Sequence, residues 1–314
     1  MKKNTRLSQN FSFWESNLGF TVGFSQNLRF GKAAWGLEGK KGLFAAFYRG
    51  LSKAGGLLKK ALLVGGLFFT GLAPGYAQDA QSIVRSSRDR IAADTVSSRS
   101  RMVITAKDGT TSERVLDQYS KDGPRGSRTI VVFQRPPSVA NTRFLTMENP
   151  GNPDDRWIFL PALGKVRRIA ASEGSGSFMG TDFSYDDISS ASRNAELDTH
   201  TLLREENLNS RACFVIESTP KDTSYQYSKM VQWIDKSSRI AYKIELYDRR
   251  GTLVKQVEIL EVKEIQGRLS PVVTRMTTVA AGTTTTITMD ILKYDDPIPE
   301  GVFTTAYLET GRPR

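Results

Sequence analysis

From residue 101 onward, the sequence is dominated by short stretches in which apolar and polar residues alternate. In 254–262, for example, valine, isoleucine and leucine exchange with lysine, glutamine and glutamate at roughly every second position. Successive side chains of a β-strand point to opposite faces, so this pattern predicts strands with one apolar and one polar face. We predict twelve strands, at 101–107, 113–120, 129–134, 142–147, 156–160, 165–170, 211–217, 228–234, 240–248, 253–264, 271–279 and 283–294.

Turn sequences such as Asp108-Gly109 and Gln266-Gly267 separate many of these strands, and hardly any helical pattern lies between them. We therefore predict an antiparallel meander in a mainly β fold. A sheet with one apolar face must curl on itself, pack on a second sheet or be covered by helices. Because few helices are predicted, we expect a barrel-like cup with an apolar interior. A filled two-sheet sandwich is the alternative.

The first 77 residues are typical of a secretory leader. Lys53, Lys59 and Lys60 precede an apolar run at 61–72, and Gly75-Tyr76-Ala77 follows as a cleavage site. The apolar run is shorter than the roughly 20 residues that a membrane-spanning helix needs. We predict cleavage after Ala77 and a periplasmic mature domain at 78–314, with an uncleaved anchor as the alternative. Since 1–50 is long for a charged front, we expect translation to begin near Leu51.

Basic residues are concentrated in this leader. Residues 1–77 contain 11 of the 44 Lys and Arg residues but 2 of the 33 acidic residues, so the remainder is nearly neutral. We therefore expect no nucleic-acid partner. The one cysteine, Cys213, lies in an apolar run and is expected to be a buried thiol, so that a core rather than a disulfide holds the fold. Within 83–92, Ile83, Val84 and Ile91 share one face of a predicted helix.

The most distinctive stretch is 156–188, RWIFLPALGKVRRIAASEGSGSFMGTDFSYDDI. Its first part predicts a β-hairpin whose first strand ends at Pro161, because proline has no N–H for a strand ladder. Small residues at 172–177 then predict a flexible loop, whose glycines let it swing. Phe178 and Met179 follow, and two large apolar side chains on such a loop require an apolar surface that receives them.

The runs WIFLPALGKVRRI and GSGSFMGTDFSYDDI closely resemble the central signature of the outer membrane lipoprotein-sorting protein family, within the LolA-like superfamily of periplasmic lipid carriers. The resemblance extends more weakly over 78–308. It implies a strongly curved, unclosed antiparallel β-barrel that surrounds an apolar cavity, with a few short helices as a lid. We also expect a helical cap at 188–203 and a closing extended segment anchored by Phe303, Tyr307 and Leu308.

The residues that chemistry would need are sparse. His200 is the only histidine, which excludes a metal site with two histidine ligands and leaves one imidazole for a nucleophilic triad. We therefore expect no catalytic residue, no metal and no cofactor. Carboxylates such as Asp182 and Asp186 are the one open alternative, as the acid pair of a hydrolase that acts on envelope polymers.

Large apolar residues at alternate strand positions and on the loop are candidates for the cavity and its lid. They are Phe144, Trp157, Phe159, Ile169, Phe178, Met179, Phe183, Tyr185, Trp233, Ile244 and Leu246. Arg167 and Arg168 are neighbours in a predicted strand, so one of them is expected to face the lid or a headgroup. Exposure of both on an edge strand is the alternative.

These observations predict a periplasmic carrier that binds the acyl chains of a lipoprotein or lipid for outer-membrane sorting and performs no chemistry. Burial of acyl chains supplies about 0.8 kcal/mol per methylene, which makes binding without specific polar contacts feasible. An accessory subunit that docks on an inner-membrane lipid transporter is the main alternative. No stable membrane span is expected in the mature chain.

Overall fold

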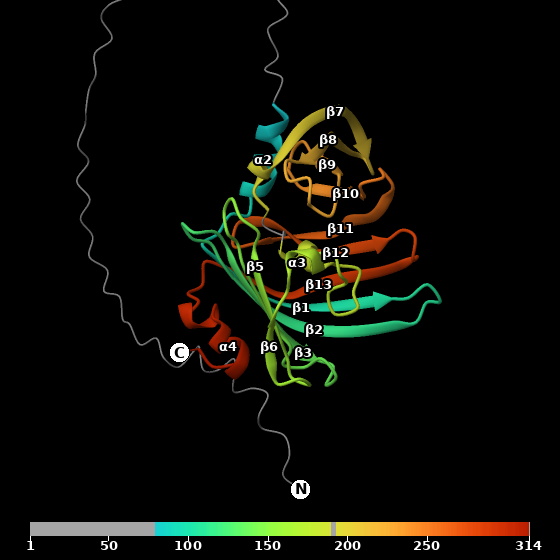
Figure 1. Ribbon diagram of the computed structural model, residues 1–314. Coiled ribbons are helices and arrows are strands. Elements are labelled where there is room, and N and C mark those ends of the chain that lie inside the picture. The colour runs from blue at the N-terminus through green and yellow to red at the C-terminus, as the bar shows by residue number, and fades with distance from the viewer. Residues whose placement is uncertain (1–78, 190–192, 314) are drawn as a thin grey trace, which may run out of the picture. The chain divides into compact units, whose positions relative to one another are not determined.

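Thirteen antiparallel strands form one sheet in the computed structural model, which describes residues 79–189 and 193–313 (Figure 1). The first six are β1 (Thr95–Thr105), β2 (Thr111–Lys121), β3 (Arg128–Arg135), β4 (Arg143–Met147), β5 (Asp155–Leu160) and β6 (Lys165–Arg168). The other seven are β7 (Asp198–Leu208), β8 (Arg211–Pro220), β9 (Lys229–Asp235), β10 (Ala241–Tyr247), β11 (Leu253–Ile265), β12 (Arg268–Thr278) and β13 (Thr283–Tyr294). The predicted leader lies outside the described residues.

The order of strands in the sheet is β6-β5-β4-β3-β2-β1-β13-β12-β11-β10-β9-β8-β7. Each half is a meander, and the two halves join where β1 pairs with β13. The two edge strands, β6 and β7, follow one another along the chain but do not pair. The strongly curved, unclosed barrel that the sequence predicts is thereby confirmed, and the two-sheet alternative is wrong.

Short helices accompany the sheet: α2 (Ala80–Asp89), η1 (Ala171–Glu173), α3 (Tyr185–Ser189), η3 (Ala195–Leu197), η4 (Glu300–Val302) and α4 (Thr305–Thr310). Helix α2 confirms the helix predicted at 83–92. The helical cap predicted at 188–203 is confirmed only at 188–189 in α3 and in η3, and it is wrong from Asp198 onward, where β7 begins; residues 190–192 lie outside the described residues. None of the described helices is long and apolar enough to cross a membrane.

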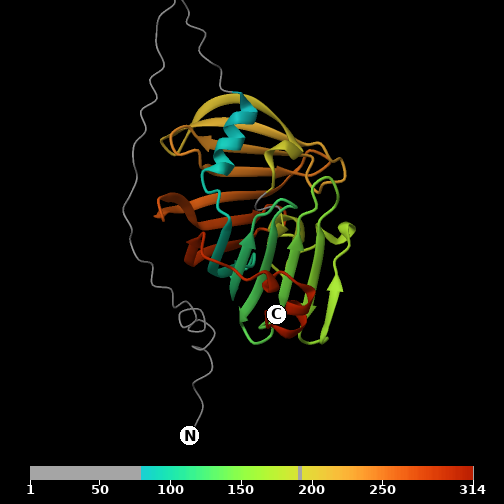
Figure 2. The same cartoon turned by 90° about the vertical axis from the view of Figure 1, so that its left-hand side faces the viewer.

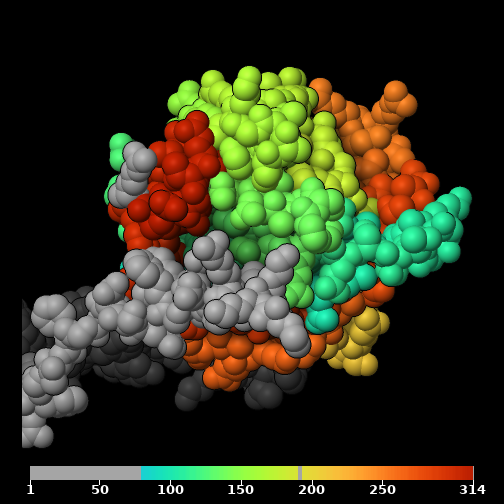
Figure 3. All heavy atoms as spheres, turned by 90° about the horizontal axis from the view of Figure 1, so that it is seen from below, coloured from blue at the N-terminus to red at the C-terminus, as the bar shows by residue number. Residues whose placement is uncertain are grey.

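The strands β3 and β4 bury side chains on both faces. In β3, Val131 and Phe133 point to the concave face, where they meet the chain segment that follows β6. Ile130 and Val132 point to the convex face, where they meet the C-terminal segment. The C-terminal segment (red) lies against the green strands in Figure 3, and Phe303 and Leu308 are its buried anchors. Tyr307 packs beside them, as predicted.

The strands β8 and β9 also bury both faces. Phe214 and Ile216 of β8 pack against Ile83 and Val84 of α2, which lies across the yellow and orange strands in Figure 2. Cys213 points to the opposite face and is fully buried, and burial raises the pKa of its thiol. The expectation of a buried cysteine is therefore confirmed.

Candidate ligand-binding site

The connection between the two edge strands covers the concave face. We call residues 169–189 the lid segment. Its central part is a compact loop in which the backbone N–H of Phe178 donates to the carbonyl oxygen of Phe183 at 2.7 Å. The hydroxyl of Thr181 donates to the Phe178 carbonyl at 2.8 Å, and the hydroxyl of Ser177 donates to the Thr181 carbonyl at 2.7 Å. These bonds give the loop a defined shape of its own, in contrast to the flexible loop predicted from its small residues.

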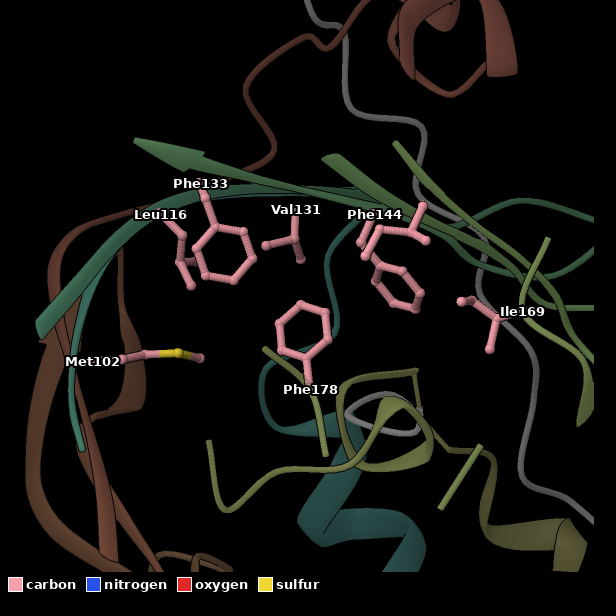
Figure 4. Packing of buried hydrophobic residues seen from close by; sticks show 8 residues of the cluster. Met102, Leu116, Val131, Phe133, Phe144, Ile169 and Phe178 are labelled. Atoms are coloured by element: carbon pink, nitrogen blue, oxygen red, sulfur yellow. The ribbon is translucent and has the colours of Figure 1, made fainter. Parts of the chain in front are cut away.

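Phe178 inserts from this loop into the concave face of the sheet, as Figure 4 shows. Its side chain is fully buried, and its ring centroid lies 5.6 Å from that of Phe133 and 5.3 Å from that of Phe144. Tyr185 of the lid segment meets the Phe178 ring edge-on at 5.5 Å. Met179 adopts a positive φ of 52°, which turns the chain directly after Phe178. Phe178 therefore packs against the apolar concave face, and a ligand cavity at this place stays a prediction.

A second apolar cluster continues this surface toward β10. Phe183 packs with Tyr227, Met230, Leu246 and Met276, and Ile244 borders them. Ile188 and Ile287 contact both this cluster and the one around Phe178. The concave face is thus one continuous apolar surface under the lid segment.

Polar contacts hold the lid segment at defined points, and the first is Asp182. This carboxylate is buried and accepts hydrogen bonds from the hydroxyls of Thr278 at 2.6 Å, Thr283 at 2.5 Å and Thr285 at 2.7 Å. The backbone N–H of Asp182 also donates to the Thr285 hydroxyl at 3.0 Å. Asp182 thereby ties the loop to β12 and β13.

Asp187 provides a second attachment. Its carboxylate contacts the Lys255 ammonium at 2.7 Å and accepts a hydrogen bond from the Tyr227 hydroxyl at 2.8 Å. Burial and the adjacent Asp187 raise the pKa of Tyr227 far above its usual value, so the hydroxyl remains a donor. Gln226 donates to the same carboxylate at 3.0 Å. The side chain of Asp187 is only 7% exposed, so its charge depends on these partners.

Asp186 provides a third attachment, through Arg156 of β5 at 2.5 Å. Burial raises the pKa of the Asp186 carboxyl, although Arg156 opposes that effect. A Cβ atom on Gly174 would lie 2.3 Å from an oxygen of this carboxylate. Glycine at 174 is therefore required for close approach, rather than for the swinging motion expected from the sequence.

The two arginines of β6 differ in their contacts. Arg167 pairs with Glu173 of the lid segment at 2.7 Å, while Arg168 pairs with Asp155 of the neighbouring strand. Both side chains are substantially exposed. Both arginines are thus exposed on the edge strand, as the alternative stated, and Arg167 is the one of the two that contacts the lid segment. A headgroup contact for Arg167 stays a prediction.

The structure brings eight of the eleven predicted cavity residues to the concave face. They are Phe144, Ile169, Phe178, Met179, Phe183, Tyr185, Ile244 and Leu246. Trp157 and Phe159 instead lie on the convex face beneath the C-terminal segment, because Ile158 is the β5 residue that points inward. Trp233 also lies on the convex face, where the Lys243 ammonium is 4.4 Å from its ring centroid. The placement of these three residues in the cavity wall is therefore corrected.

Sequence reasoning missed several residues of this site. Met102, Leu116, Val131 and Phe133 line the concave face, and their alternate spacing within β1 to β3 was a usable signal. The three threonines that hold Asp182 gave no such signal, since they are about 100 positions away in the sequence.

The carboxylates considered for hydrolysis are engaged in these attachments. Asp182 and Asp186 contact different strands, with hydroxyl groups and a guanidinium as partners. His200 is bonded to Ser218 at 2.7 Å and to the Ala195 carbonyl at 2.9 Å. Within the part of the chain that the structure describes, no three His, Cys, Asp or Glu residues are grouped to hold a metal ion.

These features define a LolA-like protein: an unclosed antiparallel barrel has an apolar concave face, and a lid that is held by polar contacts covers this face. A family model described as "-like: Uncharacterized protein" matches residues 125–310, which is more than half of the chain, so the chain belongs to that family. None of the curated proteins compared with the chain matches it.

Solved structures extend this result. The chain is similar to a DUF1329 family protein from Desulfovibrio piger, with 28% identity, a TM-score of 0.70 and coverage of 73% of this chain and 97% of that one. It is equally similar to a putative outer membrane lipoprotein-sorting protein domain from Vibrio parahaemolyticus, with 28% identity, a TM-score of 0.69 and coverage of 73% of this chain and 98% of that one. A LolA superfamily protein from Nitrosomonas europaea has the same fold, with 23% identity, a TM-score of 0.60 and coverage of 73% of this chain and 98% of that one. The resemblance predicted from 156–188 is thereby confirmed, and a carrier-type role is supported.

Proposed function

We propose that the mature chain, residues 78–314, is a periplasmic carrier that binds the acyl chains of a lipoprotein or lipid for outer-membrane sorting. It is released by cleavage after Ala77 and performs no catalysis. The observation that carries this proposal is the insertion of Phe178 into an apolar surface by a segment that forms no β-ladder with either edge strand of the sheet.

Displacement of Phe178 by an acyl chain is energetically favourable. Burial of a phenylalanine side chain contributes about 1.5–3 kcal/mol, whereas an acyl chain contributes about 0.8 kcal/mol per methylene. A chain of about ten methylenes therefore exceeds the contribution of Phe178 and offsets several hydrogen bonds at about 1 kcal/mol each. The sheet itself need not change, because its ladder does not include the lid segment.

Native mass spectrometry of the gently purified mature protein tests the proposal directly. We expect a co-purifying acyl species whose mass identifies the cargo. A protein that carries no acyl species and crosslinks only to an inner-membrane transporter would instead support the accessory-subunit alternative.

Two matched variants test where the acyl chain binds. Ile244 lies on the concave face and Phe159 on the convex face, and both are half-buried. Ile244→Gln is expected to weaken binding of a fluorescent fatty acid several-fold, while Phe159→Gln leaves it unchanged. Equal effects of the two substitutions would exclude the concave face as the binding surface.

A further inference from the structure

Helix α2 carries a charged residue on the face that packs against the sheet. Ala80, Ile83 and Val84 are buried on this face, and Arg88 follows Val84 by four residues, so it lies on the same side. The Nε atom of Arg88 is buried and has no hydrogen-bond partner. Among the described residues, Arg88 also has no ion pair.

The carboxylate that acts electrostatically on Arg88, Asp198, already has a partner. Asp198 accepts hydrogen bonds from Arg193 at 2.7 Å and 3.2 Å, so Arg193 neutralises it. Burial lowers the pKa of the Arg88 guanidinium; the charge of Asp198 opposes this effect, and that of Arg193 adds to it. A buried charge without a counterion destabilises a fold. Arg88 therefore forms no ion pair in the described part of the chain that would stabilise the fold.

Arg88 borders a pocket of about 580 Å³. One wall is formed by α2 and residues 193–196, and it presents Arg85, Arg88 and Arg193 together with Asp89 and Glu196. Glu196 pairs with Arg85 and Asp198 pairs with Arg193, so Arg88 is the arginine of this wall that has no ion pair among the described residues. The other wall is formed by the β2–β3 and β4–β5 turns. Its carboxylates, Asp122 and Glu148, accept hydrogen bonds from Ser127 at 2.6 Å and 3.0 Å but form no ion pair in the described part of the chain. The pocket thus has a guanidinium on one side and carboxylates without basic partners on the other.

The pocket lies on the same face of the sheet as the lid segment. Ile234 of β9 packs with α2, and Met230, four residues earlier in the same strand, packs with Phe183. Residues four apart in a strand share a face.

We propose that this pocket binds a zwitterionic headgroup, in which Arg88 contacts a phosphate and Asp122 and Glu148 contact an ammonium group. A purely anionic ligand would be repelled by Asp122 and Glu148, and a purely cationic one would leave the Arg88 guanidinium without a counterion. The proposal deepens the proposed function and rests on it, because such a headgroup reaches the pocket attached to acyl chains held on the concave face.

An NMR titration of the ¹⁵N-labelled mature protein tests the headgroup separately from the acyl chains. The probe is glycerophosphoethanolamine, which has no acyl chain, with inorganic phosphate and ethanolamine as separate probes. We expect glycerophosphoethanolamine to shift signals of α2 and the two turns more strongly than either fragment. Arg88→Gln should weaken this binding about tenfold to a hundredfold, which corresponds to the loss of one charge-assisted hydrogen bond. Asp122→Asn should weaken binding of glycerophosphoethanolamine but not of phosphate.

Controls distinguish binding from folding. Arg101→Gln removes an exposed arginine that pairs with Asp290 elsewhere on the sheet, and it should leave the titration unchanged. Arg88→Gln should unfold at a temperature no lower than the unsubstituted protein, since a buried unpaired charge is removed. A lower unfolding temperature with an unchanged titration would overturn the proposal, as would tighter binding of phosphate alone. Fatty-acid binding that survives in the same preparation shows that the proposed function stands even where the headgroup site fails.

Discussion

Replacement of Phe178 by alanine tests whether the lid segment fills a binding surface or only completes a core. The Phe178 side chain is fully buried and contacts three aromatic rings. Such a substitution costs about 3–5 kcal/mol, which for a domain of this size lowers the unfolding temperature by about 6–20 °C. Phe303→Ala is the matched control, because Phe303 is 2% exposed but packs on the convex face.

Palmitic acid should distinguish the two variants. Phe178→Ala leaves space on the concave face, and a ligand present at 100 times its Kd stabilises the folded state by about 2.7 kcal/mol. We expect palmitic acid to raise the unfolding temperature of Phe178→Ala by about 5–11 °C, more than that of the unsubstituted protein. The rise for Phe303→Ala should not exceed that of the unsubstituted protein. Equal rises in both variants, measured by differential scanning fluorimetry, would refute the assignment of Phe178 as a displaceable plug.

Three further predictions concern the attachments of the lid and C-terminal segments. Asp182→Asn removes an oxygen acceptor from the threonine cluster, so hydrogen exchange at 178–185 should accelerate, by an amount equivalent to about 1–3 kcal/mol. Lys255→Met leaves the buried Asp187 without its counterion and should lower the free energy of unfolding in urea by about 3–5 kcal/mol. Lys121 and Arg128 lower the pKa of Glu300 to about 2. The folded state therefore binds fewer protons than the unfolded state, and stability should fall as pH decreases from about 4.5 to about 2. Because this carboxylate is largely exposed, the loss should stay below about 1 kcal/mol, and Glu300→Gln should abolish it.

Each of these predictions has a control. Asp290→Asn removes an exposed carboxylate that pairs with Arg101, and it should not alter exchange in the lid segment. Lys263→Met breaks an exposed pair with Glu261 and should change the free energy of unfolding little. High salt should reduce the Glu300 effect. An Asp182→Asn protein with unchanged exchange at 178–185 would show that the threonine cluster does not hold the lid.

The alternation of residues predicted the sheet well, but it could not predict which set of side chains faces inward. In β5, Trp157 and Phe159 point to one face of the sheet and Ile158 points to the other. The two aromatic residues were predicted to face inward because they are larger. Both faces are covered here because the C-terminal segment packs outside, so size alone does not identify the concave face. Strand β7 was missed for a related reason: it is an edge strand that is mostly exposed, and it lacks an apolar period.

The attachments of the lid segment were beyond sequence reasoning. Asp182 and Asp187 were visible as acids among aromatics, a pattern that is equally typical of a solvated turn. Their partners lie on β11 to β13 and next to β9, and only the folded sheet brings them within hydrogen-bond distance. The resemblance at 156–188 predicted the presence of a lid, but the residues that hold it follow from long-range pairing.

The pairing of β1 with β13 means that the first and last strands of the domain, rather than its middle, join the two meanders. A protease cut between Gly174 and Gly176 would leave two polypeptides, each a complete meander, that remain associated through that ladder. Insertions and deletions in the connection would likewise leave every strand register intact. The segment that covers the concave face can therefore change in length without altering any ladder of the sheet.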